Sequence, residues 1–149
     1  MHSQQESLLT AMWRATGVTE HWLEKFGGSV DHASMANHLR ISQGSLTNKV
    51  QTYKVFRVSD STGSSWYPLW QLGYHADPVD GLTEVLVTLR RSPYIHSDWT
   101  KLRFFVETNP YLRMSLGLEV PITPVEALRF GYINEVVDSA QTYLSHGAT

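Results

Sequence analysis

Two short segments with helical apolar spacing, separated by a break of three residues, constrain the fold of this chain most strongly. In each segment, apolar residues recur three or four positions apart, which is the period of one helix face. The break is Arg-Ile-Ser, and its Ser42 is a natural N-cap for the second helix. Helices this short are not stable alone, so they must pack at an angle on a shared core. This is the helix-turn-helix layout. The apolar positions are Met35, Ala36, Leu39 and Ile41, then Leu46, Val50 and Tyr53.

The same region lacks acidic residues. No Asp or Glu occurs from Ser34 to Val58, although the whole chain has a formal net charge of −2. A solvated helix face usually mixes Glu with Lys, because such pairs stabilise the helix. A surface that faces phosphate must instead be free of acids. Charge alone also fits an ordinary solvated face, so the distribution of side chains has to decide.

The outward face of the second predicted helix carries short hydroxyls, amides and one lysine. Amides can bond adenine through two hydrogen bonds in the major groove, and hydroxyls and lysines suit phosphates or guanine. Gly44 costs about 1 kcal/mol of helix propensity relative to Ala, but it would let the backbone come close to DNA. The predicted DNA-binding residues are Arg40, Gln43, Gly44, Ser45, Thr47, Asn48, Lys49, Gln51, Lys54 and Arg57.

A β-hairpin is predicted after Lys54, where the apolar period changes from helical to alternating. The run SDSTGSS has turn composition and WYPLW returns as aromatic strand material, so the polar tip falls at Asp60 to Ser65. A hairpin directly after a recognition helix is a wing, and Arg57 on its first strand is placed to reach a phosphate. Pro68 is expected to end the second strand or limit it to a sheet edge. The alternative is a hairpin that only covers the core.

The flanking segments are predicted to be helical, which gives three parts: 1–30, 31–72 and 80–149. The first part contains a helix over 4–16 and a second over 20–26 that Thr19 caps, which serve as scaffold or dimer contact. The apolar stripe of the first helix is Leu8, Leu9, Met12 and Trp13. The third part has a helix from Leu82, a second helix that Ser97 caps and Pro110 ends, and an irregular or partly extended stretch after it. A helix then begins at Thr123-Pro124 and stops at Gly131, and a last one runs from Ile133 to about Ser145.

Catalytic, metal and cofactor sites are not expected. The chain has no Cys, which excludes disulfides and thiolate ligands and fits a reducing compartment. His32 and His38 are six positions apart and do not share a helix face as a zinc-binding pair does. The sequence contains neither a glycine-rich phosphate loop nor a nucleophile motif. No apolar run approaches the roughly 20 residues that span a bilayer, and the N-terminus does not resemble a secretory signal.

A resemblance to known proteins spans about Ala33 to Leu144. Its first part, in which Tyr67-Pro68 and Trp70-Gln71 close the hairpin, looks like the DNA-binding part of related bacterial proteins. The segment from Phe104 to Leu144 resembles the C-terminal domain of the Xre/MbcA/ParS-like antitoxins, in which Asn-Pro, Thr-Pro, a Gly and a final Val-Val helix follow one another. The resemblance implies a protein-binding domain, which in that family contacts a toxin of the RES type that attacks NAD. The spacing between Asn109-Pro110 and Thr123-Pro124 is longer than in the family, and one Gly stands where two are common.

Together these features predict a mainly α protein: a winged helix-turn-helix with a small β-hairpin, followed by a helical C-terminal domain. We expect a bacterial-type transcriptional regulator that binds double-stranded DNA as a homodimer, without enzyme activity, in the cytoplasm and on the nucleoid when bound. The rival hypothesis is an antitoxin-like protein that neutralises a RES-type toxin, with DNA binding secondary. The C-terminal domain serves dimerisation in the first case and toxin binding in the second.

Overall fold

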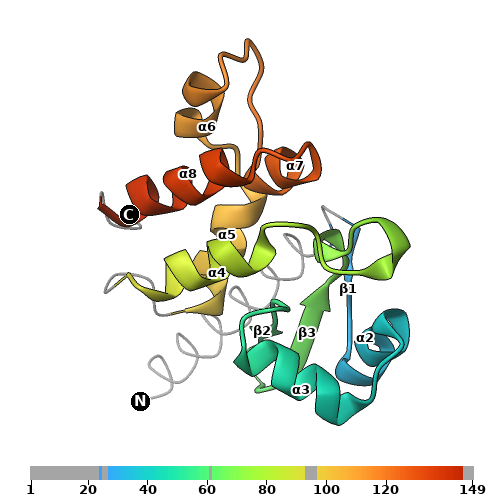
Figure 1. The fold of residues 1–149 in the computed structure, drawn as a ribbon. Helices are drawn as coiled ribbons and strands as arrows, with labels where there is room; N and C mark the ends of the chain where they lie inside the picture. The colour runs from blue at the N-terminus through green and yellow to red at the C-terminus, as the bar shows by residue number, and fades with distance from the viewer. Residues whose placement is uncertain (1–23, 25–26, 61, 93–96, 146–149) are drawn as a thin grey trace, which may run out of the picture.

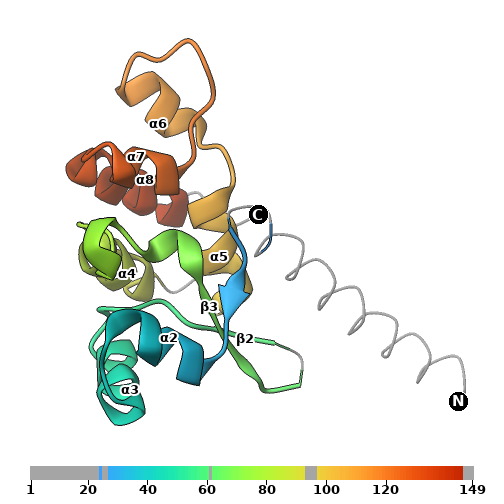
Figure 2. The ribbon, with the colours of Figure 1, turned by 90° about the vertical axis from the view of Figure 1, so that its right-hand side faces the viewer.

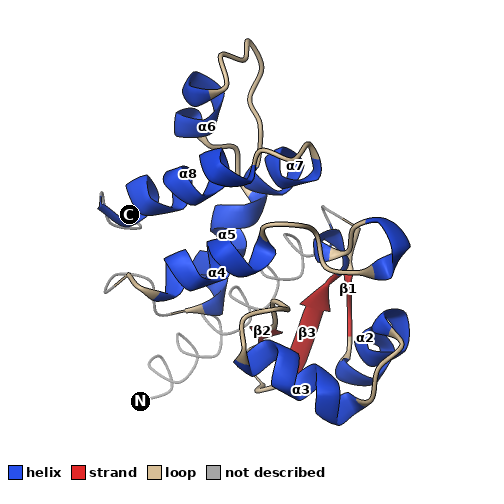
Figure 3. Ribbon diagram, viewed as in Figure 1, coloured by secondary structure: helices blue, strands red, loops and turns tan. Residues whose placement is uncertain are grey.

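The structure is a computed structural model that describes residues 24, 27–60, 62–92 and 97–145. These residues form a mainly helical protein with a small three-stranded antiparallel sheet (Figures 1 and 3). The N-terminal helices predicted over 4–16 and 20–26 lie, apart from Glu24, outside the described residues. Within the described part of the chain, no helix has the length and apolar character needed to cross a membrane. The helices are α2 (His32–Leu39), α3 (Gln43–Gln51), α4 (Leu82–Arg90), α5 (Asp98–Val106), α6 (Pro110–Ser115), α7 (Pro124–Arg129) and α8 (Ile133–Ser145).

The sheet has β3 (Ser65–Pro68) in its centre, between β1 (Ser29–Val30) and β2 (Val58–Ser59). Strand β3 pairs antiparallel with β2 to form the predicted hairpin, with Val58 opposite Trp66. Its other neighbour, β1, was not predicted. Pro68 does end its strand, but that strand is central and Pro68 lies opposite Ser29. The proline is accommodated because it is the last residue of β3, beyond which the chain turns into a short 3-10 helix.

A small hydrophobic cluster fixes α2 and α3 on one face of the hairpin. Met35, Ala36 and Leu46 from the helices meet Val55 and Tyr67 from the hairpin, and each is at most 2% exposed. Leu39, Ile41 and Val50 pack on its edge, as the sequence predicts. Tyr53, in contrast, lies beyond the end of α3 with a positive φ of 61°. That backbone reversal turns its ring away from this cluster and toward a second, larger one.

The larger cluster joins the hairpin to the C-terminal helices. At its centre are three aromatic rings, with the centroids of Trp70 and Phe105 4.8 Å apart and Phe56 within 6 Å of both. Because side chains alternate along an extended chain, Val55 faces the small cluster and Phe56 faces the large one. In Figure 2, α2 and α3 lie at one end of the molecule, α6 to α8 at the other, and α4, α5 and the sheet between them.

One part of the C-terminal half differs from the prediction. Helix α5 ends at Val106, before Pro110, and Pro110 starts α6 in the stretch predicted to be irregular. The side chain of Asn109 accepts a hydrogen bond of 3.1 Å from the backbone N–H of Leu112, so Asn109 caps α6. Proline suits the first position of a helix, where its missing N–H has no partner to lose. The Asn-Pro pair therefore begins a helix here and does not end one.

The predicted N-caps of α5 and α7 are confirmed, and so are the predicted bounds of α8. Ser97 caps α5, and Thr123 forms a capping box with Glu126 at the start of α7. On α8, Val136 and Ala140 are fully buried against the large cluster. This face of α8 is therefore used inside the chain and is not available as a dimer surface.

Gly81 marks where the starts of α4 and α8 approach each other. Its φ is +89°, and a Cβ at this position would lie 2.8 Å from two side-chain carbons of Ile133. Both the backbone conformation and the space therefore require glycine at this point. The contact helps to hold the start of α4 against the start of α8.

Candidate nucleic-acid interface

Helix α3 is fixed by its cap and by one buried face. The hydroxyl of Ser42 accepts a hydrogen bond of 3.1 Å from the backbone N–H of Ser45, as predicted for an N-cap. Leu46 is fully buried against α2, and Val50 one turn later is half-buried. The opposite face of α3 thus points away from the core. It carries the residues that the sequence singles out, and of these Gln43, Gly44, Ser45, Thr47, Asn48 and Gln51 are exposed while Lys49 is half-buried.

The two hydroxyls on this face, those of Ser45 and Thr47, differ in whether they can still donate a hydrogen bond. Thr47 donates its hydroxyl proton to the carbonyl of Gln43 over 3.1 Å, so only its oxygen remains to accept a bond. Ser45 accepts a bond of 2.9 Å from the Ser42 hydroxyl, which leaves its own proton available to donate. Phosphate oxygens accept hydrogen bonds. Ser45 is therefore the better phosphate ligand of the two, whereas Thr47 is partly used in stabilising the helix.

The side-chain amide of Asn48 and the ammonium groups of Lys49 and Lys54 have no partners within the described residues. No hydrogen bond there involves the side-chain amide of Asn48, and no ion pair involves Lys49 or Lys54; the ion pair found in the described residues is between Arg103 and Glu107. A free amide on an exposed helix face can make two hydrogen bonds to a base edge. Lysines without acidic neighbours keep their full attraction for a polyanion.

Arg40 and Arg57 come from the segments before and after α3 in the sequence. Arg40 is the exposed C-cap of α2 and adopts a left-handed conformation with a φ of 58°, in the turn that leads into α3. Arg57 precedes β2 and lies near the hydroxyl of Tyr67: burial raises the pKa of that hydroxyl, and the positive charge of Arg57 opposes the shift. The structure therefore directs Arg57 toward the α2–α3 side of the hairpin. The predicted cations thus come from the turn, the helix and the base of the hairpin.

The tip of the hairpin is organised around one carboxylate. Asp60 accepts hydrogen bonds from the backbone N–H of Thr62 at 2.8 Å and of Ser64 at 3.0 Å, and from the indole N–H of Trp66 at 2.8 Å. A bond from the Thr62 hydroxyl, together with those from Trp66 and the two backbone N–H groups, lowers the pKa of Asp60 to about 2. The tip therefore carries a negative charge at neutral pH, and no cation lies among its described residues.

We expect the hairpin tip to lose stability only in strong acid. The bonded carboxylate has a lower pKa when folded than its ordinary value of 3.8. Its contribution is thus complete above pH 3.8 and is lost as the pH falls through about 2. The measurement is the NMR shift of the Trp66 indole proton between pH 5 and pH 1.5. In Asp60→Asn this titration should vanish, and a midpoint near 4 in the unmodified protein would contradict the bonded tip.

Gly44 has no structural reason to be glycine. A Cβ placed there meets nothing closer than the Ser42 hydroxyl at 4.0 Å, and its φ is not positive. We therefore predict that Gly44→Ala raises the free energy of unfolding, by up to about 1 kcal/mol, through better helix propensity. If the backbone of α3 approaches DNA closely, the same methyl group weakens DNA binding. Thermal unfolding and a binding titration on one variant measure the two effects. Equal or tighter binding would show that DNA does not approach the backbone there.

Sequence reasoning missed two groups beside this surface. The guanidinium of Arg90, from α4, lies 5.0 Å from the ring centre of Tyr53, immediately after α3. The imidazole of His32 bonds both the hairpin and the first residue of α3. For Arg90, the pair of arginines at 90–91 is a signal that the sequence does show. For His32, the sequence suggests only a metal ligand, because its contact with Tyr67 spans 35 positions and no local pattern reveals it.

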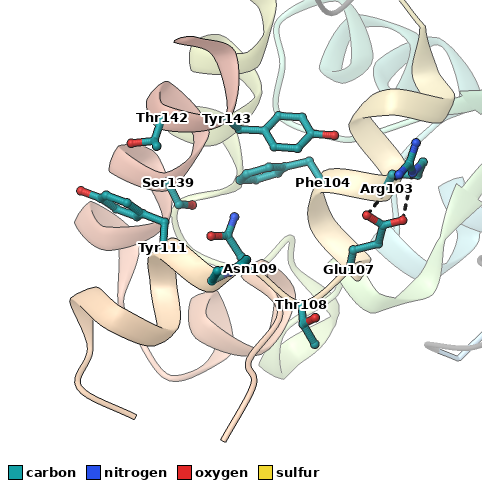
Figure 4. Close-up of a pocket in the computed structure, with 10 residues that line it drawn as sticks. Arg103, Phe104, Glu107, Thr108, Asn109, Tyr111, Ser139, Thr142 and Tyr143 are labelled. Atoms are coloured by element: carbon teal, nitrogen blue, oxygen red, sulfur yellow. Dashed lines mark hydrogen bonds and ion pairs between the residues drawn. The ribbon is translucent and has the colours of Figure 1, made fainter. Parts of the chain in front are cut away.

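A separate hollow of about 340 Å³ lies between α5, α6 and α8, away from α3 (Figure 4). Its wall contains Phe104, Tyr111 and Tyr143 together with the ion pair of Arg103 and Glu107, whose closest atoms are 2.9 Å apart. Because those two charges neutralise each other, the wall does not favour an ion of either sign. Elsewhere in the described ranges, no group of three His, Asp or Glu side chains is placed to hold a metal ion.

Comparison with known proteins gives one structural neighbour. No family model matches the sequence, and no curated protein matches it. Among solved structures, the chain is similar to Rv2175c, whose structure was determined by NMR, with a TM-score of 0.59. The match covers 78% of this chain and 80% of that chain at 19% sequence identity. At this level of identity, the similarity shows that the two chains share a fold.

Proposed function

We propose that this protein is a sequence-specific DNA-binding transcriptional regulator that acts as a dimer. In this proposal, α2, α3 and the β2–β3 hairpin form a winged helix-turn-helix, and α3 is the recognition helix in the major groove. The predicted contacts are Arg40, Gln43, Gly44, Ser45, Thr47, Asn48, Lys49, Gln51, Lys54 and Arg57.

The observation that carries the proposal is the outward face of α3. It is exposed, lacks acids, and presents an amide and a lysine that have no partner within the described residues. On a helix face that only contacts water, an acidic side chain three or four residues from Lys49 would stabilise the helix, and α3 has no such side chain. The side chains present are those that recognise base edges and phosphates.

The charges also indicate which part of the hairpin faces DNA. Asp60 holds the tip together as a carboxylate and would repel phosphate, while Arg57 stands at the base of the hairpin next to α2 and α3. We therefore place the backbone contact of the wing at its base. In this proposal, the tip stabilises the hairpin and does not contact DNA.

The experiment that tests the function is selection of genomic fragments by the purified protein, followed by sequencing. Recovered fragments that share a motif support sequence-specific binding. The salt dependence of binding to that motif then counts phosphate contacts, because the logarithm of affinity falls by about 0.9 per contact for each unit of log salt. Lys49→Ala and Lys54→Ala should each flatten the slope by about one unit per subunit. An unchanged slope in both variants, or the absence of a shared motif, would contradict the proposal.

A second candidate function rests on exposed apolar side chains at the other end of the molecule. Met114 is 81% exposed, Phe130 73% and Val120 65%, although each is a residue type that is usually buried. These positions lie in and around α6 and after α7, within the segment that resembles the Xre/MbcA/ParS-like antitoxins. Such side chains suit a protein partner, either a second copy of this chain or a toxin.

Two measurements separate these partners. Light scattering at tens of micromolar gives the oligomeric state, and Met114→Glu should convert a dimer formed through this surface into a monomer. Coexpression with a RES-type toxin tests the antitoxin hypothesis: the cellular NAD concentration should be preserved by the intact chain and not by Met114→Glu. A monomer that binds a single undivided DNA site tightly would contradict the dimer.

A further inference from the structure

The imidazole of His32 lies between the hairpin and the recognition helix. Its Nδ1 is 2.7 Å from the hydroxyl of Tyr67 in β3, and its Nε2 is 3.0 Å from the backbone carbonyl of Gln43, the first residue of α3. Tyr67 is fully buried in the small hydrophobic cluster. The ring therefore links a rigid strand residue to the start of α3.

The chemistry of these groups fixes the direction of each hydrogen bond. A carbonyl oxygen only accepts, so the Nε2 of His32 must carry the proton that bonds Gln43. In the neutral ring, Nδ1 is then the acceptor, and Tyr67 donates its hydroxyl proton to it. These three groups form one hydrogen-bonded chain that runs from Tyr67 through His32 to Gln43, and the guanidinium of Arg57 lies near its Tyr67 end.

Each member of this chain is held in a single role. Burial raises the pKa of the Tyr67 hydroxyl, which therefore remains a protonated donor at neutral pH. The carbonyl of Gln43 also accepts from Thr47 on the next turn, so the same atom holds the first turn of α3.

We propose that His32 and Tyr67 are positioning residues for nucleic-acid binding: their hydrogen-bonded chain fixes the first turn of α3 relative to the hairpin, at whose base Arg57 lies. The inference rests on the proposed function, and it assigns two residues that do not themselves contact DNA. A phosphate contact and the base-contacting helix are then presented to the duplex in one fixed geometry, which sequence-specific binding needs more than non-specific binding does.

The chain has a spectroscopic signature that does not depend on DNA. Long-range ¹H–¹⁵N NMR of the histidine rings in the free protein at pH 8 should show His32 as the Nε2–H tautomer. In Tyr67→Phe, which keeps the ring and removes the hydroxyl, the ¹⁵N shift of Nδ1 should move toward that of an unbonded acceptor. An Nδ1–H tautomer in the unmodified protein would overturn the proposed chain.

Binding variants test the functional part. Tyr67→Phe and His32→Ala should each weaken binding to the selected motif about tenfold, equivalent to about 1.4 kcal/mol, and weaken binding to random DNA by less. His32→Gln, whose amide can still donate to the Gln43 carbonyl, should recover part of the loss. The matched control is His38→Ala, a histidine exposed at the other end of the same helix, with a change below about twofold.

The outcomes separate this inference from the proposed function. If the unmodified protein selects a motif but Tyr67→Phe binds it with unchanged affinity, the positioning role is wrong and the regulator proposal stands. The positioning role is equally overturned if Tyr67→Phe loses affinity for specific and random DNA equally. If the unmodified protein selects no motif, the proposed function fails, while the tautomer measurement still decides whether the hydrogen-bonded chain exists.

Discussion

Replacing Gln71 by leucine should lower the free energy of unfolding by about 2–5 kcal/mol, because the replacement leaves buried backbone groups without partners. Gln71 is fully buried at the end of the hairpin. Its Oε1 accepts a hydrogen bond of 2.8 Å from the N–H of Phe56, and its Nε2 donates to the carbonyls of Phe56 at 2.8 Å and Pro68 at 2.9 Å. Leucine fills a similar volume but can satisfy none of these three groups. Denaturation in urea measures the loss.

The position of these bonds makes the effect larger than that of a single lost contact. Phe56 belongs to the segment between α3 and β2, which forms no regular structure of its own. Without Gln71, its hydrogen bonds that join this segment to the end of β3 are lost. The position of Arg57, which lies on the same segment, then becomes less well defined. Gln141→Leu, on the exposed side of α8, is the matched control and should change stability by less than about 0.5 kcal/mol. A loss below 1 kcal/mol for Gln71→Leu would mean that water replaces the amide.

The helices could be predicted where local chemistry marks their ends. Ser42, Ser97 and Thr123 are all N-caps in the structure, as their sequence context predicts. The errors fall where the local signal has two meanings or none. Asn109-Pro110 suits a helix start as well as a helix end, and only the cap bond to Leu112 decides between them. Strand β1 has two residues, too few to show a period, so its pairing with β3 is set by tertiary structure.

The candidate site was predictable only in part, for the same reason. The composition of α3 marks its outward face, since an acid-free run of amides and hydroxyls is visible in the sequence. The groups that we propose to orient this face are not visible there, because His32 and Tyr67 come from separate elements and meet only in the folded chain. The sequence therefore indicates candidate contact residues, and the fold is needed to find the residues that position them.

Replacing Asn48 by alanine should reduce affinity for the selected DNA motif by about 1–3 kcal/mol, the usual value of a two-bond contact between an amide and a base. Asn48 is exposed on α3, and its amide has no hydrogen bond within the described residues. Its loss therefore costs the fold nothing, and alanine is the better helix former. The expected result is weaker specific binding with unchanged or slightly higher thermal stability. Titration of the variant against the motif and against random DNA of equal length measures the difference.

The comparison between the two DNA ligands identifies the role of the side chain. A base contact is lost only on the motif, so the ratio of specific to non-specific affinity should fall by about the same factor as the specific affinity itself. The salt slope should stay unchanged, because no cation is removed. Asn37→Ala, an exposed asparagine on α2, is the matched control and should leave both affinities within about twofold. Equal losses on motif and random DNA would place Asn48 against the phosphate backbone, and no loss on either would remove α3 from the interface.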